Sequence, residues 1–91
     1  MTGFLSDLQW TDKKVFLDEL IYSIHSAKSV NHGKISLKKL ANGFEKLFNI
    51  SLGNFYDKFS DLSDRKANKT SYLDALTRTL NDRIENPDNY K

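Results

Sequence analysis

Apolar side chains recur every three or four positions through most of this chain, and they fall into four separate stripes. This is the spacing of helices that each turn one face toward a core. We therefore expect four helices, at about residues 12–27, 37–48, 52–63 and 71–85. The stripes are Phe16, Leu17, Leu20, Ile21 and Ile24; Leu37, Leu40, Ala41, Phe44, Leu47 and Phe48; Leu52, Phe55, Tyr56, Phe59 and Leu62; and Leu73, Leu76, Leu80 and Ile84.

The residues between the stripes suit helix ends and turns. Thr11, Ser36 and Thr70 stand where an N-cap hydroxyl is expected, just before the first, second and fourth stripes. Gly33 in "SVNHGK" suits a turn position with positive φ, and Pro87 ends the last helix. The connections are short, so the pattern predicts one all-α domain over residues 1–91, with Phe44 buried at the centre of the second helix.

Asn49, Ile50 and Ser51 separate the second and third stripes, and Ile50 is expected to fill the angle between two helices. Two short helices joined in this way fit a helix-turn-helix, whose second helix enters the major groove of DNA. A purely structural corner between two helices has the same spacing. The pattern alone leaves both interpretations open.

Composition indicates the cellular compartment of the protein but says less about its chemistry. The chain has no cysteine, which excludes disulfides and thiolate zinc sites and favours a reducing compartment. No apolar run approaches the roughly 20 residues of a membrane span, and the N-terminus lacks the pattern of a signal peptide. We expect a cytoplasmic domain that makes no membrane contact.

The positive charge is concentrated in the middle of the chain. The formal net charge is only +2, but residues 28–49 hold five lysines against Glu45, a sum of +4. Such a segment can face phosphates, and a solvated helix face explains the same lysines. The lysines are Lys28, Lys34, Lys38, Lys39 and Lys46.

The residues that usually carry catalysis or bind metals are missing. His25 and His32 have no carboxylate or cysteine partners at ligand spacing, whereas a metal site needs three or four converging ligands. The chain also lacks a nucleophile elbow and a glycine-rich phosphate loop. We therefore expect neither an enzyme nor a bound cofactor or metal.

Several unusual stretches occur together in order: Trp10-Thr11, "ELIYSIH", "NHG", "FEKLFNISLGNFY" and "RKANKTSYLDAL". Over about residues 8–85 the chain resembles the C-terminal region of the RteC family, regulators encoded on conjugative transposons of Bacteroides and its relatives. The resemblance implies a winged-helix-like domain that binds duplex DNA and controls transcription. Any wing is limited to a few residues near 63–70. Family members have a longer region before this point, so the chain is an excised domain or a short relative.

The resemblance also implies which residues meet DNA. The helix at 52–63 would be the recognition helix, and the loop at 63–70 would hold the phosphate backbone. Relatives usually carry arginine at the position of Asp57, and a basic or amide residue where this chain has Ser63-Asp64. Both departures reduce the expected affinity for DNA. The candidate DNA-binding residues are Lys38, Lys39, Asn54, Asp57, Lys58, Arg65, Lys66, Lys69 and Thr70.

A second interpretation stays open beside DNA binding. The domain could be a helical protein–protein or dimerisation module that has lost its DNA-binding surface. Its partner would then be a second copy or the N-terminal region of a longer protein. An exposed apolar patch including Phe4, Leu5, Leu8 or Trp10 would favour this alternative, although Trp10 also fits a core position that seals the first helix.

Overall fold

The computed structural model describes residues 6–53 and 68–90, and these residues contain helices but no strand. The first helix, α1, spans Lys14–Ser26, and α2 spans Leu37–Phe48; the 3₁₀ turn η1, Asn31–Gly33, lies between them. The helix α4 spans Ser71–Glu85 and is followed by the 3₁₀ turn η2, Pro87–Tyr90. The described part of the chain is therefore all-α, as predicted.

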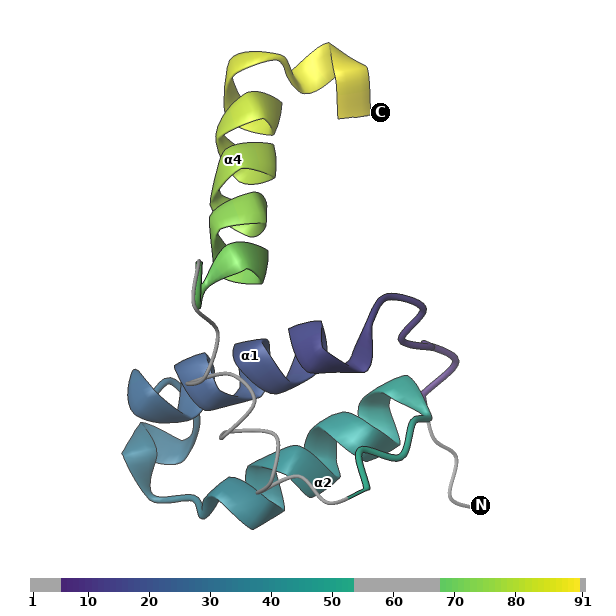
Figure 1. Ribbon diagram of the computed structural model, residues 1–91, viewed down its shortest axis with the longest axis vertical. Coiled ribbons are helices and arrows are strands. Elements are labelled where there is room, and N and C mark those ends of the chain that lie inside the picture. The colour runs from purple at the N-terminus through teal and green to yellow at the C-terminus, as the bar shows by residue number, and fades with distance from the viewer. Residues whose placement is uncertain (1–5, 54–67, 91) are drawn as a thin grey trace.

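The core lies between α1 and α2, which pack side by side and run in opposite directions (Figure 1). Fully burying a leucine or isoleucine side chain stabilises a fold by roughly 1.5–3 kcal/mol, so this small cluster contributes much of the domain's stability. Its members are Leu17 and Ile21 (each 0% exposed), Leu40 and Ala41 (each 5%) and Leu52 (4%).

Two predicted helices have the predicted bounds, and the first does not. Helix α2 begins after Ser36, whose hydroxyl accepts a hydrogen bond from the Lys39 amide at 3.1 Å. Helix α1 begins at Lys14, so the prediction of Thr11 as its N-cap is wrong. The Asp12 carboxylate accepts from the Lys13 amide at 2.8 Å, and the Trp10 indole donates to the Lys13 carbonyl at 2.9 Å. These two bonds accompany an extended Lys13, which delays the helix start.

The segment after α2 departs from the prediction at its first residues. Leu52 and Gly53 are not helical, so a helix does not begin at Leu52. Leu52 is instead buried in the core, and its amide donates to the Glu45 carboxylate at 2.8 Å. The rest of the predicted third helix, residues 54–63, lies outside the described residues.

Helix α4 has the predicted length, but its predicted buried face is wrong. Leu76, Leu80 and Ile84 are 38%, 58% and 67% exposed. Only the first turns of α4 pack against α1, and the remainder of the helix stands away from α1 and α2 (Figure 1). The turn η2 folds back against the far end of the helix. The apolar stripe is therefore real, but its distal half stays mostly exposed, with only Tyr90 of η2 beside it among the described residues.

One further expectation is corrected, and the short wing stays a prediction. Phe44 is half-buried rather than buried, and it packs against the edge of the core cluster. In the predicted wing region, residues 68–70 form a turn with no strand, and residues 63–67 lie outside the described part of the chain.

Candidate nucleic-acid interface

The first turn of α2 presents two predicted DNA contacts to solvent. Lys38 and Lys39 are both exposed, and this turn contains no acidic residue. The positive end of the helix dipole disfavours cations here and favours anions, so the two lysines gain stability when an anion binds nearby. The surface at the start of α2 is therefore built to attract negative charge.

The other lysines of the middle segment strengthen this positive field. Lys28, Lys34 and Lys46 are exposed like Lys38 and Lys39. None of the five forms an ion pair with another residue that the structure describes. Uncompensated charge of this kind raises the local potential and is the electrostatic footprint expected of a phosphate-binding surface.

The end of α2 is held by a corner that the sequence predicted in outline. Asn49 adopts the left-handed conformation (φ 51°) that ends many helices, and Ile50 packs against the core as expected. The Asn49 side chain also donates to the carbonyls of Ser6 and Leu8, each at 2.8 Å. These bonds fix the N-terminal segment along the end of α2. The turn residues in the sequence did not predict this contact.

Trp10 takes the structural role that the sequence offered as one of two options. Its ring packs edge-on against Phe48, with centroids 5.3 Å apart, and its backbone amide donates to the Phe48 carbonyl at 3.2 Å. Its half-buried side chain contacts the core cluster. Leu8 is exposed, whereas Phe4 and Leu5 lie outside the described residues.

The start of α4 is anchored to α1 by a buried carboxylate. The Leu73 amide donates to the Glu19 carboxylate at 2.8 Å, and Glu19 is only 4% exposed. An acid at a helix N-terminus satisfies an otherwise unpaired amide and suits the helix dipole. The Tyr72 ring stacks on Phe16 at 4.8 Å, and burial, with Asp12 and Glu19 nearby, raises the pKa of Tyr72.

Lys69 and Thr70 lie in the turn before α4. Thr70 occupies the N-cap position as predicted, but its hydroxyl makes no cap bond and contacts Asn68 and Asp74 instead. This turn lies across α1 from α2 in Figure 1, so the structure does not bring Lys69 and Thr70 together with Lys38 and Lys39. The other candidates, Asn54, Asp57, Lys58, Arg65 and Lys66, lie outside the described residues.

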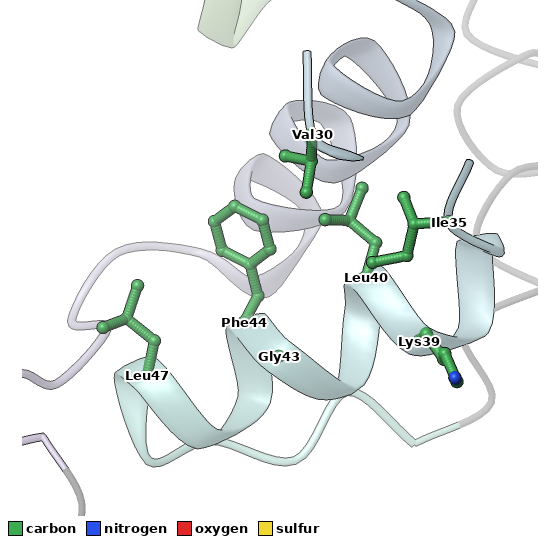
Figure 2. A pocket seen from close by; sticks show the side chains of 7 residues that line it. All are labelled: Val30, Ile35, Lys39, Leu40, Gly43, Phe44 and Leu47. Atoms are coloured by element: carbon green, nitrogen blue, oxygen red, sulfur yellow. The ribbon is translucent and has the colours of Figure 1, made fainter. Parts of the chain in front are cut away.

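An apolar groove borders the lysine surface, and the sequence did not predict it. The groove has a volume of about 210 Å³ and lies between α2 and the loop before it. Figure 2 shows the Lys39 side chain pointing away from the apolar residues, so the ammonium group lies at the edge of the groove. The apolar side chains of the groove are Val30, Ile35, Leu40, Phe44 and Leu47.

Other kinds of site find little support in the described residues. No three histidine, acidic or cysteine side chains among them are grouped so that they could hold a metal ion. None of their helices is both long and apolar enough to cross a membrane.

The model of one protein family, described as RteC protein, matches residues 4–88, which is nearly the whole chain. The chain therefore belongs to the RteC family. Comparisons with curated proteins and with solved structures gave no match.

Proposed function

We propose that this member of the RteC family is a DNA-binding domain of a transcriptional regulator carried by a conjugative transposon. Family membership over residues 4–88 is the observation that carries the proposal. In this proposal the domain acts in the cytoplasm by binding duplex DNA and does not catalyse a reaction.

The lysine surface of α2 supports the proposal physically. Lys38 and Lys39 are exposed and form no ion pair with a described residue, at a helix end where the dipole also attracts anions. In a helix-turn-helix the first helix crosses the DNA backbone while the second reads base edges. We assign phosphate contact to the start of α2, and base contact to Asn54, Asp57 and Lys58, which lie outside the described residues.

A matched pair of double variants tests this assignment. Lys13 and Lys14 are also adjacent and exposed, and they lie at the start of α1. The control Lys13→Ala/Lys14→Ala therefore removes the same charge from another surface. Binding to a DNA duplex should weaken strongly in Lys38→Ala/Lys39→Ala and little in the control. The slope of log affinity against log salt should become shallower by about 0.9 for each phosphate that the variant no longer neutralises.

Equal weakening of both double variants would mean that net charge alone drives binding, and that α2 is not the DNA-facing element. Absence of duplex binding by the unaltered domain at low salt, with helical circular dichroism intact, would overturn the proposed function. In that case the family fold would serve the other role that the sequence suggested, as a protein–protein module.

A further inference from the structure

The distal half of α4 carries an exposed apolar surface, and Tyr90 of η2 lines one side of it beside Leu76 and Leu80. Leu76, Leu80 and Ile84 follow one another at intervals of four residues, which places them on one face of the helix. All three are exposed. An exposed apolar row on a helix that stands away from the body is typical of a surface that binds another element in a groove.

The groove beside α2 is a concave apolar surface of the same chain. Gly43 lies in its wall, between Leu40 and Phe44 along the helix (Figure 2). A Cβ atom added at Gly43 would meet no described atom within 4 Å. A glycine inside a helix costs up to about 1 kcal/mol relative to alanine, and packing among the described residues does not require it. A closely approaching partner helix does explain it, because small residues allow close approach.

One flank of the α4 row is acidic, the other is basic, and the facing edge of the groove is basic. Lys39 lines the groove, and Lys46, seven residues further on, lies along the same edge of α2. Glu85 follows directly after Ile84 at the edge of the α4 row. On the opposite flank the Arg83 guanidinium lies over the Tyr90 ring, 5.6 Å from its centre. This arrangement allows an acidic flank of α4 to meet the basic edge of the groove.

The helix cannot fill the groove of its own chain. The bond from Leu73 to Glu19 and the stacking of Tyr72 on Phe16 fix the first turns of α4 on α1. From there the helix points away from α2 (Figure 1). A convex apolar helix and a matching groove on the same chain, kept apart by the fold, can meet in a second copy.

We propose that Leu76, Leu80 and Ile84 of one copy dock in the α2 groove of a second copy. Each copy supplies one helix and one groove, so two equivalent contacts close a two-fold dimer. The contact is small, and interfaces at the low end of the size range are weak, so we expect a dissociation constant on the order of 10–100 µM. The proposed dimer does not require DNA. Lys39 lies both on the lysine surface and at the edge of the groove, so bound DNA would affect the contact. Dimerisation is therefore measured without DNA.

Sedimentation equilibrium with single variants tests each side of the contact. Leu80→Glu places a charge in the α4 row, and Gly43→Arg fills the groove where there is open space, so neither disturbs the core. Each should raise the dissociation constant at least tenfold. Leu8→Glu changes another exposed leucine that lines neither the groove nor the α4 row, and it should leave the dissociation constant unchanged. A wild-type chain that stays monomeric at millimolar concentration would overturn the proposal.

Mixing experiments show which surfaces meet. A mixture of Leu80→Glu and Gly43→Arg chains contains one intact helix and one intact groove, so it should form heterodimers more tightly than either variant forms homodimers. Because the chain has no cysteine, Ile84→Cys and Leu47→Cys chains can be joined specifically by a short bismaleimide. The mixed pair should cross-link efficiently. Efficient cross-linking of Ile84→Cys chains to each other instead would indicate α4–α4 pairing and overturn the proposal.

Discussion

Helices α2 and α4 carry apolar stripes that look alike in the sequence but differ in what covers them. Leu40 and Ala41 of α2 are buried against α1 and Leu52, whereas Leu80 and Ile84 of α4 are mostly exposed. Helical periodicity shows that a face is apolar, but the covering element depends on the direction in which the rest of the chain leaves. In the proposed dimer, this exposed stripe is the surface that docks on a second copy.

The two helices also start differently. Helix α2 is capped by the hydroxyl of its own Ser36, so local sequence suffices to define its first turn. Helix α4 receives its buried acceptor from Glu19, far away in the sequence. The position of α4 therefore depends on α1 being folded, whereas the start of α2 does not.

Truncation of one leucine in each region gives the largest expected contrast. Leu17→Ala leaves a cavity at a fully buried site and should lower the free energy of unfolding by about 2–5 kcal/mol. Leu80→Ala removes a mostly exposed side chain and should cost less than about 0.5 kcal/mol. Urea denaturation at micromolar concentration measures both. Similar destabilisation of the two variants would mean that the distal half of α4 is covered within one chain.

Glu19 links the two regions, and its removal should be the next largest effect. Glu19→Ala leaves the buried Leu73 amide without its acceptor, which costs roughly 1–3 kcal/mol. Glu19→Gln retains a carbonyl oxygen and should cost less. Thermal and urea unfolding of both variants provide the measurement. Equal destabilisation of the two would show that the carboxylate–amide bond does not hold α4.

Substitution of Asn49 tests the corner at the end of α2. Asn49→Ala removes both the tolerance for positive φ and the two bonds to the N-terminal segment, and should cost about 1–2 kcal/mol. Asn49→Gly keeps the backbone conformation and removes only the side-chain bonds, so it should be less destabilising in urea unfolding. Equal destabilisation of the two variants would mean that the side-chain bonds, rather than the backbone conformation, carry most of the effect.

Gly43 gives the smallest change, and its sign is opposite. Gly43→Ala fits the open space and raises helix propensity, so α2 should gain about 0.5–1 kcal/mol in urea unfolding. A decrease in stability at micromolar concentration would show that something in the same chain approaches Gly43.

The sequence predicted local features better than long-range ones. The bounds of α2 and α4, the positive φ of Gly33 and the turn residue Asn49 all follow from nearby residues. Thr11 is not the cap of α1, because the helix begins only after Lys13. The Lys13 amide donates to the Asp12 carboxylate, and the Lys13 carbonyl accepts from the Trp10 indole. Residue type alone does not predict these bonds.

The tertiary features had no clear local signal. Nothing local in the sequence shows that Glu19 is buried and accepts a hydrogen bond from the Leu73 amide of α4. The groove arises where the loop holding Val30 and Ile35 meets α2, and its shape depends on Gly43 lacking a side chain. The lysine surface was visible in the charge distribution, but only the structure separates Lys38 and Lys39 from Lys69 and Thr70.

Residue-resolved amide hydrogen exchange at two protein concentrations tests the central contrast most directly. At low micromolar concentration, amides of the distal half of α4 should exchange much faster than those of Leu17 to Ile21 in α1. Near millimolar concentration, protection should rise together in distal α4 and around Gly43 of α2. Distal α4 amides that are as protected as those of α1 in the dilute sample would contradict the account.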